Sequence, residues 1–207
     1  PGRRVLAVDA VRDDVALAVT GDTIAAIGPT DQILESYHNA EIYNGRGKAL
    51  FPGLINCHAH LAQTLGRGFN EDFGFPNSAR LAVQPNSLLQ PGEATLMATI
   101  GALEAIRTGT TTLVEMSSGI SPHAAALAGS GLRMVLAEAV RDSENVAGPM
   151  APDGLAKSVT PRFSAKLRDD GLQRISDLFT AWHGKNQGRI SVFPAAALAE
   201  NSSPELL

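Results

Sequence analysis

Cysteine is almost absent from this chain of 207 residues, because Cys57 is its only one. A single cysteine excludes an internal disulfide and favours a reducing compartment, so we expect a cytoplasmic protein. Clusters of lysine and arginine are also missing and the net charge is −4, which argues against nucleic-acid and anionic-membrane partners. No uninterrupted apolar run approaches the roughly 20 residues that cross a bilayer.

What the chain does contain is ordinary globular composition, with 44% hydrophobic and 18% charged residues. This is enough for one large domain or two small ones. Residues 1–50 read as strands and turns. Apolar runs at 15–19 and 23–27 flank a Thr-Gly-Asp turn, which predicts a small antiparallel unit.

From residue 51 onward, strand-like and helical patterns alternate. Strands are predicted over 54–58, 110–114, 132–137 and 189–193, with helices between them over about 91–109, 121–131 and 167–184. The order β-α-β-α-β-α-β implies an α/β fold with a parallel sheet and crossover helices. It supplies four of the eight strands of a (β/α)8 barrel. The apolar helix stripes, such as Leu96, Ile100, Leu103 and Ile106, are predicted to pack on the sheet.

The first of these strands ends in a His-x-His pair, His58 and His60. Side chains alternate along a strand, so both imidazoles should point the same way. Two converging neutral imidazoles suit zinc or a similar divalent metal. Taken without its context, the pair would be better interpreted as two partly buried structural histidines. Cys57 lies between them and is predicted to face the helices as a buried apolar residue.

The motifs around the pair are more specific than the pair itself. LFPGLINCHAHLAQTLGRGF (50–69) and ALEAIRTGTTTLVEM (102–116) resemble the first barrel strand, first helix and second strand of metal-dependent amidohydrolases. VTGDTIAAIGP (19–29) resembles the family's opening β-sandwich hairpin, and SSPELL (202–207) the segment after the fourth strand. The branch is that of cytosine-deaminase-like, S-adenosylhomocysteine-deaminase-like and triazine-hydrolase enzymes. The resemblance implies a partial β-sandwich at 1–52 and the N-terminal half of a TIM-type (β/α)8 barrel at 53–207.

The resemblance also implies a chemistry. A metal ion, with zinc ahead of iron, would activate water to attack the amino-bearing carbon of a nitrogen heterocycle and release ammonia. His58 and His60 would be two of its ligands, and Gln63 falls where several relatives contact substrate. Glu115 ends the second predicted strand and is a candidate substrate contact or an ordinary hydrogen-bonded strand end. Cyclic-amide hydrolysis and dechlorination stay open as alternative reactions. Loops 61–90 and 142–165 are expected to rim the site.

The pattern departs from the family after the fourth strand. Relatives add histidines from the fifth and sixth strands, an aspartate from the eighth and a proton-shuttling glutamate. A catalytic zinc takes three protein ligands plus water, so we expect a fragment that is inactive by itself. A half barrel leaves strand edges and apolar faces uncovered, so a second copy or a complementary C-terminal fragment is the expected partner. A non-catalytic remnant that acts only in assembly is the alternative.

Overall fold

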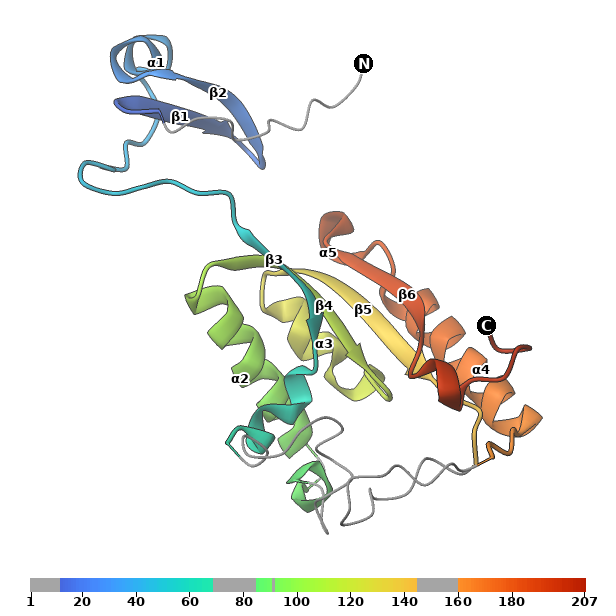
Figure 1. Ribbon diagram of the computed structural model, residues 1–207. Coiled ribbons are helices and arrows are strands. Elements are labelled where there is room, and N and C mark those ends of the chain that lie inside the picture. The colour runs from blue at the N-terminus through green and yellow to red at the C-terminus, as the bar shows by residue number, and fades with distance from the viewer. Residues whose placement is uncertain (1–11, 69–84, 91, 145–159) are drawn as a thin grey trace. The chain divides into compact units, whose positions relative to one another are not determined.

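The computed structural model describes residues 12–68, 85–90, 92–144 and 160–207 (Figure 1). The chain divides into two compact units, residues 1–51 and 52–207. In the first unit, β1 (Val15–Thr20) pairs antiparallel with β2 (Thr23–Pro29), which confirms the predicted hairpin. Helix α1 (Thr30–Ser36) follows directly and was not predicted.

The second unit is built on a four-stranded parallel sheet in the order β3-β4-β5-β6. Its strands are β3 (Leu54–Ala59), β4 (Thr110–Ser117), β5 (Arg133–Val140) and β6 (Ile190–Ala196). Its crossover helices are α2 (Glu93–Arg107), α3 (Ser121–Gly129) and α4 (Ala165–Trp182). Short turns of helix are η1 (Leu61–Gly66), η3 (Pro85–Leu88), α5 (Lys185–Gly188) and η4 (Ala199–Asn201). The predicted α/β alternation is confirmed.

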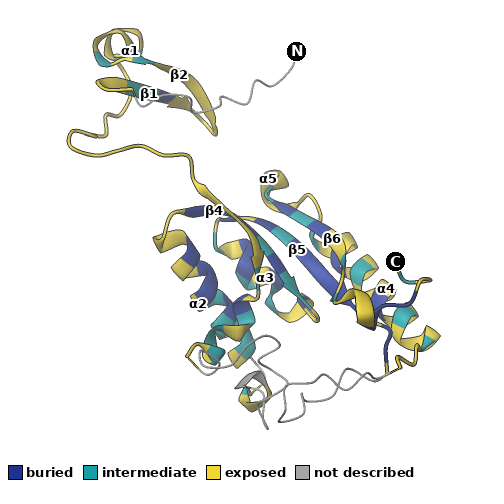
Figure 2. Cartoon of the chain, viewed as in Figure 1, coloured by how far each residue is buried: buried dark blue, intermediate teal, exposed yellow. Residues whose placement is uncertain are grey.

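All three crossover helices pack on the same face of the sheet. Leu113 of β4, Met134 of β5 and Ile190 of β6 share one core cluster with buried residues of α2, α3 and α4. Val114, Val135 and Phe193 alternate with these core residues along their strands and so lie on the other face, where they are only partly buried or exposed. Figure 2 colours the chain by this burial. A sheet covered by helices on one face is the arrangement expected of part of a (β/α)8 barrel.

The predicted packing of α2 is wrong. Its large apolar residues are between 38% and 55% exposed: Leu96, Ile100, Leu103 and Ile106. The face toward the core instead carries Ala98, Gly101, Ala102 and Ala105. Small residues occupy this face because η1 and the sheet approach the helix closely. A methyl group built on Gly101 would lie 2.9 Å from the Thr64 hydroxyl and 3.2 Å from the Leu61 carbonyl oxygen.

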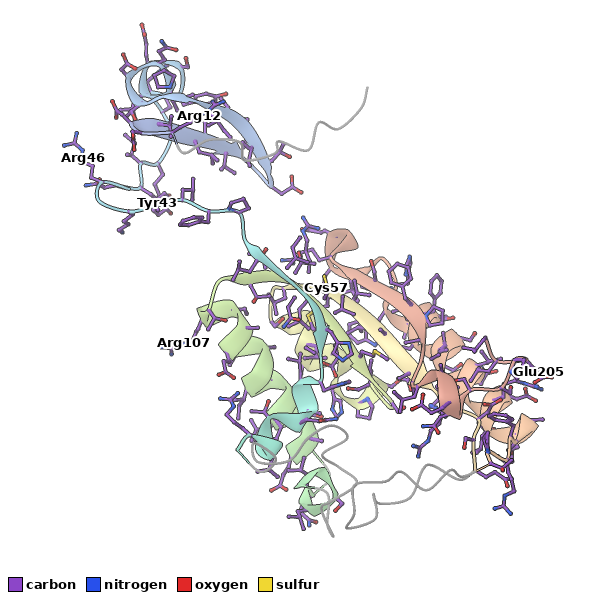
Figure 3. The ribbon with its side chains drawn as sticks, viewed as in Figure 1. Arg12, Tyr43, Arg46, Cys57, Arg107 and Glu205 are labelled. Atoms are coloured by element: carbon purple, nitrogen blue, oxygen red, sulfur yellow. The ribbon has the colours of Figure 1, made fainter. Side chains whose placement is uncertain are left out.

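One smaller prediction is also corrected. Cys57, labelled in Figure 3, is exposed rather than buried against helices. The reason is that β3 is an outer strand of the described sheet, so a side chain on it is covered from one side at most. Helix α2 begins at Glu93 after Gly92, whose φ is 89°, and the predicted first helical residue, Pro91, lies outside the described residues. No helix within the described ranges combines the length and hydropathy needed to span a bilayer.

Candidate metal-binding site

The His-x-His pair stands at the carboxyl end of β3, where the chain turns into η1. Both histidines are exposed, and their Nε2 atoms lie 3.2 Å apart. The backbone N–H of His58 donates to the Asn56 side-chain oxygen at 3.0 Å, inside the register shift where β3 pairs with β4. The two imidazoles therefore converge on one point, as their spacing in the sequence predicts.

The ring of His60 is held by the neighbouring strand. Its Nδ1 forms a hydrogen bond with the carbonyl oxygen of Met116 in β4. A carbonyl oxygen accepts only, so Nδ1 carries the proton and the lone pair of neutral His60 is on Nε2. Metal-bound histidines commonly donate their second ring nitrogen to a carbonyl in this way. The imidazole is thus already in the tautomer that ligation by Nε2 requires.

The spacing of the two nitrogens fits a tetrahedral ion. Zinc sits about 2.0–2.1 Å from each histidine nitrogen, so two nitrogens 3.2 Å apart would subtend roughly 100° at the ion. Two ligands are fewer than a catalytic zinc site uses. Among the described residues, no group of three or more His, Cys, Asp or Glu side chains is placed to hold a metal. The pair fits part of a zinc site.

Gln63 lies close to the histidine pair. It is exposed on η1, and its backbone N–H donates to the His60 carbonyl oxygen at 3.0 Å. Gln63 and His60 both line a hollow of about 530 Å³ between β3, η1, α2 and β4. The geometry is compatible with the predicted substrate contact, which stays a prediction.

Glu115 is near the pair but faces the helix side of the sheet. It is 2% exposed and shares its face with Leu113. Its Oε2 accepts the Leu61 backbone N–H at 2.7 Å, and its Oε1 accepts the Ser117 hydroxyl at 2.6 Å. Burial raises the pKa of Glu115, while these two hydrogen bonds and the nearby His60 and His58 oppose the rise. The hydrogen-bonded strand end is thus present, and substrate contact by Glu115 stays a prediction.

The turn after the histidines is anchored to α2. Arg67, just beyond η1, forms a two-pronged ion pair with Glu104, with distances of 3.0 and 2.5 Å. Hydrogen bonding to Glu104 raises the pKa of Arg67, and the same contact lowers the pKa of Glu104. This contact and the small surface at Gly101 hold η1, with Gln63 on it, against the helix.

Two further buried carboxylates pin the loops at this end of the sheet. Glu138 accepts the backbone N–H groups of Gly119 and Ile120 and pairs with Arg174 at 3.2 Å. Asp142 accepts both the backbone N–H and the hydroxyl of Ser203. Most of the predicted rim loops, residues 69–84 and 145–159, lie outside the described residues.

The remaining histidines belong to other segments of the chain. His38 is exposed in the first unit. His183 stacks on Phe179 with ring centroids 4.2 Å apart, and its Nδ1 accepts the Val192 N–H, which fits the structural role predicted for it. His123 meets the Thr95 hydroxyl at 2.9 Å, and burial lowers its pKa.

Comparison with known proteins agrees with this geometry. The sequence profile of the amidohydrolase family matches residues 49–207, which include β3, the histidine pair and the whole parallel sheet. The chain belongs to the amidohydrolase family. The predicted resemblance is thereby confirmed at the level of the family.

Individual relatives of this amidohydrolase chain are deaminases. It is 31% identical over 200 residues to a 5-methylthioadenosine/S-adenosylhomocysteine deaminase from Pelotomaculum thermopropionicum, covering 96% of this chain and 41% of the relative. It is 35% identical over 136 residues to a 5'-deoxyadenosine deaminase from Methanocaldococcus jannaschii, covering 65% and 31%. The chain thus spans about two fifths of the length of the first of these relatives, and less of the second.

Solved structures show the same fold. A mutant of atrazine chlorohydrolase from Arthrobacter aurescens, complexed with zinc and atraton, superposes with a TM-score of 0.69 at 22% identity. The match covers 92% of this amidohydrolase chain and 43% of that one. Guanine deaminase from E. coli gives 0.64 at 20% identity, covering 93% and 40%. Together with the four-stranded parallel sheet, these matches confirm the partial barrel.

Sequence reasoning did not find the groups that orient the histidine pair. The Met116 carbonyl is a backbone group that every residue type supplies, and the Leu61 N–H is one that every residue type except proline supplies, so no sequence pattern marks them. The ion pair between Arg67 and Glu104 joins residues 37 positions apart. Only the folded chain brings these groups together.

Proposed function

We propose that His58 and His60 supply two ligands of a divalent metal, zinc ahead of iron, in an enzyme that hydrolytically deaminates an amino-substituted nitrogen heterocycle. The observation that carries the proposal is the 3.2 Å approach of the two Nε2 atoms, with the His60 tautomer set by the Met116 carbonyl. The likeness to deaminases of adenine-containing compounds supports this reaction over cyclic-amide opening and dechlorination. Those two reactions are the alternatives.

The roles of the chain's own residues follow from their positions. A metal held by the pair would supply the Lewis acidity that makes water nucleophilic near neutral pH. The Nε2 atoms of His58 and His60 would bind the metal, and the lone pair of neutral His60 is already on its Nε2. Gln63, on the turn that follows, donates a hydrogen bond to the heterocycle or accepts one from it. Its side-chain amide can donate to a ring nitrogen and can accept from an amino group.

The active form requires more polypeptide than the described sheet provides. Among the described residues, no strand pairs with the outer edge of β3 or of β6, and the face opposite the helices carries partly exposed apolar residues. A second copy of the chain, or a complementary C-terminal portion of a barrel, would cover both, and the C-terminal portion would also add the remaining ligands. The reaction is proposed for that assembled form, and the chain alone is expected to be inactive.

Metal titration of the full chain tests the site. We expect zinc to bind one per chain in calorimetry, with affinity reduced by more than about tenfold in His58→Ala and in His60→Ala. His38→Ala is the matched control, because His38 is an exposed histidine of the other unit. Its zinc affinity should equal that of the wild type.

The outcomes separate the competing functions. Zinc affinity that is unchanged in both His58→Ala and His60→Ala would contradict the proposed metal site. Zinc binding without activity, followed by ammonia release from an adenine nucleoside when a C-terminal barrel half is added, would support the assembled deaminase. No metal and no activity in either form would favour the non-catalytic remnant.

A further inference from the structure

Both oxygens of the buried Glu115 carboxylate already accept a hydrogen bond from the chain itself. Oε2 accepts the Leu61 N–H at 2.7 Å and Oε1 accepts the Ser117 hydroxyl at 2.6 Å, and the residue is 2% exposed. Its side chain lies on the sheet face that carries Leu113 and the helices. The Glu115 carboxylate therefore restrains the groups that donate to it, and the first of these is the backbone N–H directly after His60.

His60 is therefore tied to β4 on both sides. Its ring is bonded to the carbonyl of Met116, and the next amide along the chain is bonded to the side chain of Glu115. Residues 115 and 116 are adjacent in one strand, so one rigid element fixes both the ring and the backbone that carries it. The Nε2 atom of His60 then has one position relative to His58.

We propose that Glu115 is a positioning residue that acts through the Leu61 amide to hold His60 with its Nε2 toward His58. This positioning role rests on the proposed function in one respect, that His58 and His60 bind a metal. A charge-assisted hydrogen bond in a water-excluded place is strong and directional, so it restrains the turn between β3 and η1. Removing the carboxylate leaves the buried Leu61 amide without its partner.

The test reads the His60 tautomer directly. Histidine-labelled full chain gives long-range proton–nitrogen spectra with five imidazoles to assign, and His60→Gln identifies the signal. In the wild type, we expect His60 to be protonated on Nδ1. In Glu115→Ala, the form protonated on Nε2 should rise severalfold, because the turn relaxes away from the Met116 carbonyl. Glu115→Gln should restore the wild-type population, since its amide oxygen still accepts the Leu61 N–H.

Glu138→Ala is the matched control. Glu138 is also a buried glutamate at a strand end that accepts backbone amides, but those amides belong to Gly119 and Ile120. It should lower stability and leave the His60 tautomer unchanged. If Glu115→Ala does not fold, Glu115→Asp replaces it, because its shorter side chain lifts the carboxylate off the Leu61 amide.

Zinc affinity is the second readout. We expect a loss of about 10–100-fold in Glu115→Ala and no loss in Glu138→Ala. A folded Glu115→Ala or Glu115→Asp variant in which His60 keeps the wild-type tautomer population overturns the positioning role. That unchanged population is what a role in substrate contact predicts. If the wild type binds no zinc while the tautomer still shifts, the metal proposal fails and the positioning role stands.

Discussion

At the scale of single residues, the candidate site depends on hydrogen bonds that hold polar groups in one orientation. The identities of His58 and His60 suggest a metal, but the Met116 carbonyl selects the tautomer. The same holds for Arg67, whose pairing with Glu104 decides where the turn after the histidines lies. Exposed ion pairs of this kind contribute little to stability, but they can bias the position of a short segment.

The pair between Arg67 and Glu104 predicts a pH dependence. The contact lowers the pKa of Glu104 in the folded chain. Its stabilising effect is therefore complete above the pKa of unfolded Glu104 and is lost as pH falls through the lowered folded value. Glu104→Gln should have a slightly lower urea midpoint than the wild type at pH 7, and the difference should shrink toward pH 3.

Arg67→Gln is the control for that measurement. It removes the other half of the same pair, so its difference from the wild type should shrink over the same pH interval. High salt should reduce both differences at pH 7 because the pair is exposed. Differences that stay constant between pH 7 and pH 3 would show that the pair makes no contribution.

At the scale of elements, two helices carry a glycine where a neighbouring element comes closest. Gly171 of α4 is buried, and a methyl group built on it would overlap Val140 of β5. Gly101 has the same role on α2 against η1. Apolar periodicity predicts both helices correctly and yet assigns the wrong face of α2 to the core. The reason is that close approach of two backbones favours the face with the smallest side chains over the most apolar one.

Gly171→Ala should destabilise the chain although alanine is the better helix former. We expect a loss of about 1–3 kcal/mol in the free energy of unfolding, because Val140 and the helix must move apart. Gly129→Ala is the matched control: it is exposed in α3 with open space around it, and should gain up to about 1 kcal/mol. Urea denaturation of both variants measures this. A stabilised Gly171→Ala would contradict the close packing.

At the scale of the whole molecule, the parallel sheet ends at two outer strands. β3 exposes Leu54 and Ile55, and β6 exposes Phe193. An unpaired edge with apolar side chains is a template for association. The described part of the chain thus has the candidate half-site and an uncovered surface on the same strand, β3.

Ile55→Lys should weaken self-association of the chain. Ile55 is 66% exposed on β3, and covering it would bury the introduced ammonium group. We expect the association constant from sedimentation to fall by about tenfold or more. Ala181→Lys, at an exposed position of α4, adds the same charge elsewhere and should have no such effect. A wild-type chain that sediments as a folded monomer would refute the association itself.

The amino-acid sequence by itself determined the order of strands and helices, the parallel sheet, the hairpin of the first unit and the histidine pair. These depend on local periodicity and on short motifs, which can be recognised without spatial neighbours. Tertiary structure alone decided the core face of α2, the exposure of Cys57, the His60 tautomer and the partners of Glu115. Each of those depends on backbone atoms or side chains brought together from distant positions, and a one-dimensional pattern does not contain such distances.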